Sequence, residues 1–381
     1  MEGVLRELES RNAHGAGFID ATTLAAEVVL SNQRVFTEMW TKNERNPCMG
    51  IALTAARAYV AYLYKIVVYD TATMQMIKEI AVRGTHIWNI SLSRDEKSLF
   101  VTCEDLSVRI INPETGKRVN LCGHDDRIRC VIQGEGDDVL TCSNDNTVRR
   151  WNSSTGACLK IYRGHTDPVN SILYDRLTKR IFSASNDNTI AVWDAGADEK
   201  IGMLEGHREV AVYTGISHPT TWPVTLVPAN SATKRTFTDS LDGLTAWNAE
   251  TGVRIGTVVG KYEPVVSIVQ VNDTTFATIT RKRGLIELWN MTTLGRIKSI
   301  YFDGPAVSLA ATPDGQYLIS GSVDGDVNIW SVATSRCVHT ILDSKDTPMS
   351  LVVSTDGRFI ASGGLGGITH MFSVSPPFSR N

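Results

Sequence analysis

Short stretches in which apolar and polar residues alternate recur along the chain, separated by turns rich in glycine, aspartate and asparagine. A clear series is "PVNSILYD" (168–175), followed by "RIFSASND", "TIAVWD" and "EKIGMLEGH". Alternation with a period of two over about five to seven residues is typical of β-strands that bury one face. We therefore predict four consecutive short strands in this part of the chain.

The ending of the third strand recurs at regular intervals. The residues that close it are Tyr69, Ile111, Trp151, Trp193, Trp247, Trp289, Trp330 and Phe372, at intervals of 42, 40, 42, 54, 42, 41 and 42 residues. Four strands in a repeat of about 42 residues are typical of one blade of a β-propeller. We expect an all-β fold with eight blades, and seven blades if a weak terminal unit is miscounted.

The last repeat lacks a fourth strand of its own. Phe372 is followed only by "SVSPPFSRN", which is too short and too rich in proline to form one. The segment "QRVFTEMWTK" (33–42) alternates like an outer strand, so we expect it to pair with the last blade and close the ring. The predicted organisation is an N-terminal extension (1–32) with a short helix starting near Asp20, a propeller (33–375) and a tail (376–381).

Three sequence features in these repeats resemble those of WD40-repeat proteins. "GH" precedes the first strand at three histidines, "SNDNT" stands at a turn, and "WN" or "WD" closes the third strand. The resemblance covers about residues 33–375 and is best in the units ending at Trp151, Trp193 and Trp330. It implies a platform that binds proteins or peptides without catalysis.

Serine or threonine, histidine and aspartate in each repeat are also the side chains of a hydrolase triad. A triad needs one nucleophile, one base and an oxyanion hole in a single cleft, whereas these residues recur in successive repeats without a G-x-S-x-G turn. The resemblance instead implies a structural hydrogen-bond chain in each blade, and we expect no catalytic residues. The three matching sets are His124, Thr141, Asp145 and Trp151; His165, Ser183, Asp187 and Trp193; and His207, Thr238, Asp242 and Trp247.

Composition narrows the possible partners. The formal net charge of −3 shows no basic excess that would call for direct binding of nucleic acid or an anionic membrane. No apolar run approaches a membrane span, and we expect a cytoplasmic or nuclear protein. The seven cysteines contain no C-x-x-C pair, so we expect free thiols and neither a metal nor a cofactor.

Rim loops are the expected contact surface, because they present side chains on a rigid scaffold. They are the loops that enter each first strand and the turns between the second and third strands. We expect partner-binding residues among His86, Glu104, Asp125, Arg127, Asn144, Thr166, Asn186, Arg208, Tyr262, Asp303 and Lys345.

Two departures from the repeat are further candidates. Arg281, Lys282 and Arg283 stand where other repeats have Ser, Asn and Asp; they form either a solvated basic turn or a site for an acidic or phosphorylated peptide. An insertion at 217–234, expected between the first and second strands of its blade, contains Trp222, which is either packed on the blade or exposed as a contact.

The function expected from these features is an interaction scaffold within a multiprotein complex. A substrate-recognition subunit of a ubiquitin ligase and a subunit of an RNA-processing or chromatin complex remain alternatives, although the W-D-x-R signature of one adaptor class is absent. An enzyme that uses the propeller channel is a further alternative, since a propeller fold does not by itself settle function.

Overall fold

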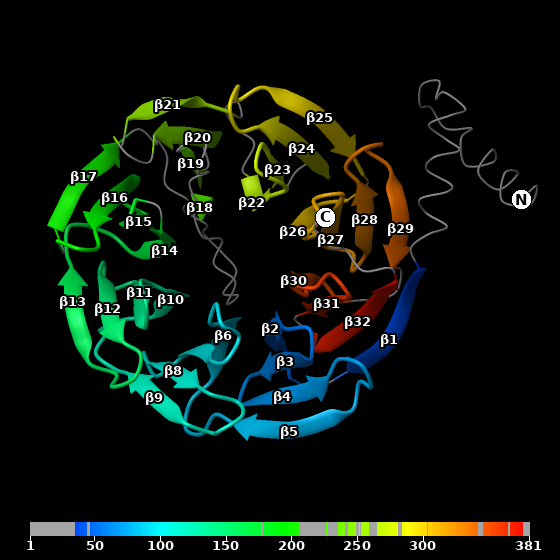
Figure 1. Ribbon diagram of the computed structural model, residues 1–381, viewed down its shortest axis with the longest axis horizontal. Coiled ribbons are helices and arrows are strands. Elements are labelled where there is room, and N and C mark those ends of the chain that lie inside the picture. The colour runs from blue at the N-terminus through cyan, green and yellow to red at the C-terminus, as the bar shows by residue number, and fades with distance from the viewer. Residues whose placement is uncertain are drawn as a thin grey trace, which may run out of the picture.

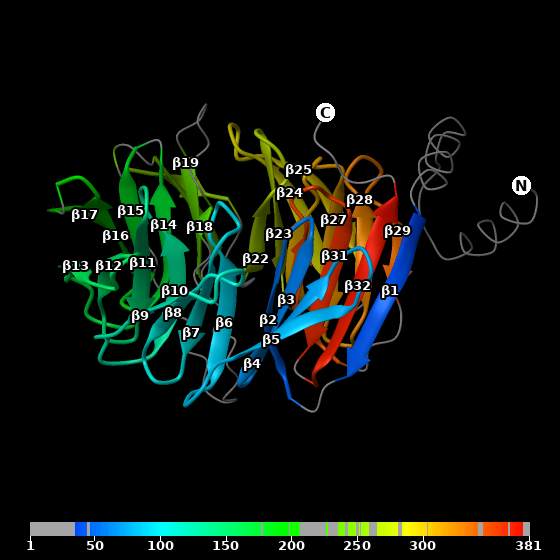
Figure 2. The same cartoon turned by 60° about the horizontal axis from the view of Figure 1, so that its bottom comes forward.

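The computed structural model describes residues 35–43, 46–176, 178–197, 199–205, 226–227, 235–240, 243–248, 251, 253–258, 265–280, 284–302, 304–341, 346–364 and 366–375. These residues contain 32 strands, which form eight antiparallel sheets of four strands each, and no helix. The sheets are arranged as blades of a ring, with the first strand of each blade nearest the central axis (Figure 1). The eight sheets form an eight-bladed β-propeller, which Figure 2 shows turned by 60°.

The strands follow the chain in order, four to a blade. In blades 1 to 4 they are β2 (Cys48–Leu53), β3 (Arg57–Tyr62), β4 (Lys65–Asp70) and β5 (Met76–Ala81); β6 (Ile87–Leu92), β7 (Leu99–Cys103), β8 (Val108–Ile111) and β9 (Arg118–Leu121); β10 (Ile128–Gln133), β11 (Asp138–Ser143), β12 (Val148–Asn152) and β13 (Cys158–Tyr162); β14 (Val169–Asp175), β15 (Arg180–Ser185), β16 (Thr189–Asp194) and β17 (Glu199–Glu205). In blades 5 to 8 they are β18 (Leu226–Val227), β19 (Arg235–Ser240), β20 (Gly243–Asn248) and β21 (Arg254–Thr257); β22 (Val265–Gln270), β23 (Thr275–Thr280), β24 (Leu285–Asn290) and β25 (Arg296–Tyr301); β26 (Ala306–Ala311), β27 (Tyr317–Ser322), β28 (Val327–Ser331) and β29 (Cys337–Ile341); β30 (Pro348–Val353), β31 (Phe359–Gly364), β32 (Ile368–Ser375) and β1 (Val35–Asn43).

The ring is closed by the N-terminal strand, as predicted. β1 pairs antiparallel with β32, from Val35 opposite Ser375 to Asn43 opposite Ile368. This pairing completes blade 8 and covers the edge that β32 would otherwise expose. The boundaries predicted at 1–32 and 376–381 lie outside the described residues and stay predictions.

The residue that closes each third strand packs against the preceding blade. Trp151 of blade 3 lies in a buried cluster with Phe100 and Ile110 of blade 2, and Trp193 of blade 4 lies with Leu140 of blade 3. The other closing residues repeat this arrangement and are Tyr69, Ile111, Trp247, Trp289, Trp330 and Phe372. The 42-residue period of the sequence therefore reflects one type of interface between neighbouring blades, which is repeated around the ring.

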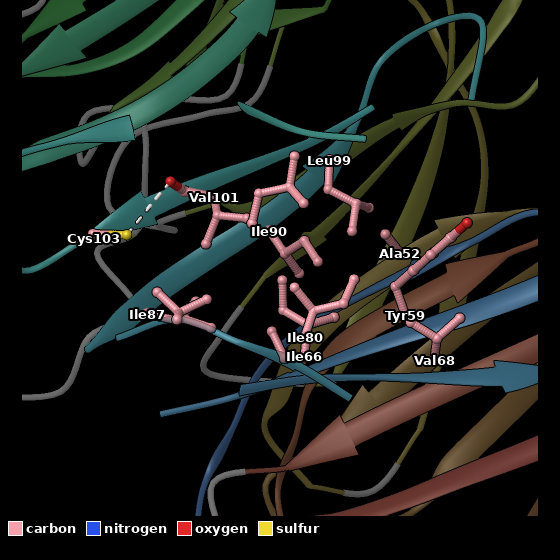
Figure 3. Close-up of a cluster of buried hydrophobic side chains, with 13 residues drawn as sticks. Ala52, Tyr59, Ile66, Val68, Ile80, Ile87, Ile90, Leu99, Val101 and Cys103 are labelled. Carbon is pink, nitrogen blue, oxygen red and sulfur yellow. Dashed lines mark hydrogen bonds between the residues drawn. The ribbon is translucent and has the colours of Figure 1, made fainter. Parts of the chain in front are cut away.

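The interface between blades 1 and 2 shows the packing in detail (Figure 3). Ile66 and Val68 on β4 meet Ile90 on β6 and Leu99 on β7, and Ile66 and Leu99 are fully buried. Because alternate residues of a strand point to opposite faces, each sheet supplies apolar side chains to two neighbours. A blade thus depends on both neighbours for its core.

Blade 5 corrects one prediction. Its first strand, β18, is Leu226–Val227 and pairs with β19, so it lies inside the stretch 217–234 that was expected to link the first and second strands. That assignment was wrong, because two prolines flank a strand of only two residues and hide its alternation. Trp222 precedes the first strand in the chain instead of following it, and itself lies outside the described residues.

Candidate protein-interaction surface

A hydrogen-bond chain crosses blade 3 below the rim. Trp151 Nε1 donates to Thr141 Oγ1 (2.8 Å), Thr141 Oγ1 lies 2.7 Å from His124 Nε2, and His124 Nδ1 lies 2.7 Å from Asp145 Oδ2. Burial lowers the pKa of His124 despite the nearby Asp145, which favours a neutral ring that donates from Nδ1 and accepts at Nε2. All three polar side chains and the indole are then satisfied.

Blade 4 repeats the chain. Trp193 Nε1 donates to Ser183 Oγ (2.9 Å), which lies 2.9 Å from His165 Nε2, and His165 Nδ1 lies 2.8 Å from Asp187 Oδ2. Burial alone would raise the pKa of Asp187, but hydrogen bonds from Thr189, from the backbone N–H of Thr166 and from His165 hold it below its usual value. Ser183 is fully buried, so its hydroxyl lies inside the blade and not in a cleft open to substrate.

The third predicted set falls largely outside the described residues. Trp247 is buried, but His207, Asp242 and the side chain of Thr238 are not described. In blades 6 and 7, where the entering loops contain no GH histidine, the indole bond persists: Trp289 Nε1 donates to Thr278 (3.0 Å) and Trp330 Nε1 donates to Ser320 (2.8 Å).

Arginine takes part in the turn of blades 2 and 3. Arg109 Nη2 donates to Asp105 Oδ2 (3.0 Å) in blade 2, where no GH histidine is present. In blade 3 the buried Arg149 Nη2 lies 3.3 Å from Asp145 Oδ2, in addition to the histidine. The sequence interpretation missed both arginines.

In blade 8, the carboxylate that accepts hydrogen bonds from the turn between the second and third strands comes from the entering loop and not from the turn itself. The turn between β31 and β32 has no aspartate, and Asp346 from the entering loop accepts hydrogen bonds from the backbone N–H groups of Gly366 (2.6 Å) and Ile368 (3.0 Å). A Cβ on Gly364 would lie 2.3 Å from Asp346 Cγ, so the glycines of "GGLGG" leave room for this carboxylate.

The inner strand is the first strand of each blade. In seven blades the register between the first and second strands is described at the top of the inner strand, and each of these seven has a β-bulge there. The top face of the propeller is defined as the one that carries the loops entering the inner strands and the turns between second and third strands. The bulged residues are Met49, Trp88, Arg129, Asn170, Val266, Val307 and Met349. Bulges re-aim side chains and are frequent beside functional sites.

Of these seven, the polar bulge residues are those of blades 3 and 4, and each bonds to the turn between the second and third strands of its own blade. Arg129 Nε donates to Asn144 Oδ1 (2.5 Å), and Asn170 Nδ2 donates to Asn186 Oδ1 (2.5 Å). The corresponding turn residue of blade 7 is Val323, which is 42% exposed. At this turn position the top face is therefore polar in blades 3 and 4 and apolar in blade 7.

Aromatic and charged side chains connect blades 1, 2 and 3 across this face. His86 Nδ1 lies 2.6 Å from a carboxylate oxygen of Glu104, and its Nε2 contacts the hydroxyl of Tyr64, which is 51% exposed. The guanidinium of Arg127 stacks 3.8 Å from the centre of the Trp88 ring. We call the residues Tyr64, His86, Trp88, Glu104, Arg127, Arg129 and Asn144 the rim cluster.

Several predicted contact residues therefore meet on one face. His86, Glu104, Arg127 and Asn144 belong to the rim cluster, Asn186 adjoins it in blade 4, and the exposed Asp125 and Thr166 donate backbone N–H bonds to Asp145 and Asp187. The remaining predicted residues lie outside the described part of the chain: Arg208, Tyr262, Arg281, Lys282, Arg283, Asp303, Lys345 and Trp222.

Sequence reasoning missed Tyr64, Trp88, Arg129 and Asn170. The last three occupy the bulge, which depends on the register between two strands and leaves no mark in a single strand's alternation. Their common place, one residue after the first buried position of the inner strand, was the available signal.

The bottom face carries a polar cavity between blades 2 and 3. Its volume is about 220 Å³, and its lining includes Ser93, Asp95, Lys117, Gln133 and Asp137. Among the described residues, no cluster of His, Cys, Asp and Glu has the arrangement of a metal site, and no helix is long and apolar enough to span a membrane. The seven cysteines are free thiols.

The geometry defines the class of protein as an eight-bladed β-propeller with a polar and aromatic rim. The family model for the WD domain, G-beta repeat, matches residues 116–152, 156–194 and 297–331, the units that end at Trp151, Trp193 and Trp330. The chain thus contains WD40 repeats in these three units, which are the three that were predicted to fit best.

Curated relatives share limited segments with this chain. "Periodic tryptophan protein 2" of Arabidopsis thaliana is 24% identical over 226 residues, which cover 59% of this chain and 24% of the relative. An F-box protein of Saccharomyces cerevisiae is 37% identical over 54 residues (14% and 8%), and a ribosome biogenesis protein of Homo sapiens is 54% identical over 33 residues (9% and 4%). The matches thus span about a quarter or less of these relatives.

A solved structure with the same fold is that of the computationally designed Ika8 protein. It superposes with a TM-score of 0.76 and 18% sequence identity, covering 88% of this chain and 99% of the designed one. At that identity the likeness concerns the fold alone.

Proposed function

We propose that this protein is a non-catalytic scaffold that holds a protein partner on the top face of blades 1 to 4. The observation that carries the proposal is the rim cluster, in which aromatic and ionic side chains from three blades contact one another at the surface. Tyrosine, tryptophan and arginine are the side chains that contribute most to protein interfaces.

The rim cluster is held rigidly by the blades beneath it. The backbone N–H of Glu104 donates to the carbonyl of His86 (2.9 Å), and that of Asn144 donates to the carbonyl of Arg127 (2.9 Å). Each entering loop is thereby tied to the turn beside it. A preorganised surface loses little conformational entropy when a partner binds, which favours affinity.

The proposed setting is a nuclear or cytoplasmic multiprotein complex. The match to a protein named for ribosome biogenesis favours a complex subunit of that kind, as does the longer match to Periodic tryptophan protein 2. Recognition of substrates for a ubiquitin ligase is the second candidate, favoured by the match to an F-box protein. Both candidates use the same surface.

Affinity purification of the full chain with quantitative mass spectrometry tests the proposal. Tyr64→Ala removes an exposed ring from the rim cluster, and Tyr301→Ala is the matched control, because Tyr301 is 71% exposed on the outer strand β25. We expect Tyr64→Ala to deplete at least one partner that Tyr301→Ala retains. Equal partner sets for both variants and the wild type would count against the rim as the binding surface.

A further inference from the structure

Two cysteines face each other across the first two strands of blade 3. Cys130 on β10 lies opposite Cys142 on β11 in the antiparallel register. Residues opposite each other in an antiparallel pair point to the same face of the sheet, with Cα atoms about 4.5–5.5 Å apart. Since a disulfide needs Cα atoms about 4.4–6.8 Å apart, the two strands hold these cysteines within the range that a disulfide spans.

The two side chains share one environment but differ in access to solvent. Both pack in the apolar cluster between blades 3 and 4, which includes Val169 and Ile172 of the inner strand β14. Cys142 is fully buried, whereas Cys130 is only half-buried. Cys130 is therefore the thiol of this pair that a small oxidant reaches first.

Contact between the two thiols also makes them chemically unequal. A hydrogen bond with the side chain of Cys142 lowers the pKa of Cys130, and burial raises the pKa of Cys142. Because the thiolate is the nucleophile, Cys130 is the more reactive thiol of the pair. Cys103 in blade 2 differs in both respects: it lies opposite Ile87, and burial raises its pKa to about 12.

We propose that hydrogen peroxide converts Cys130 and Cys142 into a reversible disulfide that joins β10 to β11. The Cys130 thiolate attacks one peroxide oxygen and becomes a sulfenic acid, and the other oxygen leaves as hydroxide, which takes up the thiol proton to give water. The sulfur of Cys142 then attacks the sulfenic sulfur, and the displaced hydroxide leaves with the Cys142 proton as a second water. The two thiols lose two electrons in total, and one peroxide is reduced to two waters. This modification site goes beyond the proposed scaffold function and does not depend on it.

Peptide mass spectrometry of the purified full chain detects the disulfide directly. Trypsin cleaves after Arg129 and Arg149 and nowhere between them, so both cysteines lie in one peptide, 130–149. The folded chain is treated with hydrogen peroxide, then denatured, alkylated with iodoacetamide and digested. We expect this peptide to escape alkylation at both cysteines together, with a mass two hydrogen atoms below that of the dithiol, at least about tenfold faster than Cys103 is oxidised. Dithiothreitol should restore alkylation at both positions.

Single substitutions separate the roles of the two thiols. In Cys142→Ala the second thiol is absent, so dimedone should trap a sulfenic acid at Cys130 that the wild type converts to the disulfide. Cys130→Ala should leave Cys142 as slow to oxidise as Cys103. Cys158→Ala is the matched control, because it removes an exposed thiol from the outer strand β13 of the same blade and should leave disulfide formation unchanged. If a variant does not fold, the wild-type peptide alone carries the test.

The inference would be overturned if Cys130 and Cys142 remained as fully alkylated after peroxide treatment as Cys103. Conversion of Cys130 to a sulfinic acid without the internal disulfide, or a disulfide from Cys130 to any other cysteine, would also overturn it. The proposed function fails separately, when Tyr64→Ala leaves every partner in place.

Discussion

Replacing Thr141 with valine removes one hydroxyl from the middle of the hydrogen-bond chain of blade 3 and leaves the side-chain shape nearly unchanged. Thr141 is fully buried, and its hydroxyl serves both Trp151 Nε1 and His124 Nε2. The substitution leaves two buried polar atoms without partners. Since each costs about 1–3 kcal/mol, we expect a loss of about 2–4 kcal/mol after the gain from the added methyl group.

Thr278→Val in blade 6 is the matched comparison. Thr278 is also fully buried and accepts from Trp289 Nε1 (3.0 Å), but "YEPVVS", the loop entering its blade, offers no histidine. The same chemical change therefore leaves one polar atom without a partner, at a cost of about 1–2 kcal/mol.

Urea denaturation followed by circular dichroism measures both losses, with equal m-values required for the comparison. Because a propeller is built from repeats, amide hydrogen exchange in each blade shows whether the loss is local. The account predicts a larger loss for Thr141→Val than for Thr278→Val. An equal or smaller loss for Thr141→Val would refute the reasoning that histidine completes the chain.

Three further predictions concern the stability of the blades and the closure of the ring. The pKa of His124 is lowered in the folded protein, so as the pH falls below about 6.5 the unfolded chain binds a proton before the folded chain does. The free energy of unfolding therefore declines as the pH falls. The urea midpoint should decline less between about pH 7.5 and about pH 5.5 for His124→Gln than for the wild type. Gly364→Ala places a Cβ against Asp346 and should cost about 2 kcal/mol or more, with faster amide exchange in β31 and β32; an unchanged exchange rate would contradict the close contact. Deletion of residues 1–43 removes β1 and exposes the edge of β32, so size-exclusion chromatography should show aggregates that the full chain does not form.

The sequence predicted the parts of the fold that repeat. The intervals between closing residues such as Trp151 and Trp193 predicted eight blades, because each such residue fills the same interface with the preceding blade. The alternation in "QRVFTEMWTK" predicted the closing strand β1. Sequence patterns are therefore sufficient to predict the fold where the same local arrangement recurs in every blade.

The sequence did not predict contacts that depend on tertiary geometry. Asp346 meets the turn of blade 8 from about twenty residues away, and an aspartate in a loop looks like any solvated turn residue. Arg149 appears as an ordinary strand residue, although it is buried against Asp145. Trp88 and Arg129 each occupy a β-bulge, which is set by the register between the first and second strands of the blade and cannot be seen in one strand's sequence.

The central claim is that a protein partner binds the top face through the rim cluster. Hydrogen–deuterium exchange of the full chain, alone and with a partner recovered by affinity purification, tests it most directly. The account predicts slower exchange at residues 84–90, 103–107 and 125–130, which form the entering loops and turn of the rim cluster. Protection confined to the bottom-face turns at 93–98 and 134–138 would contradict it.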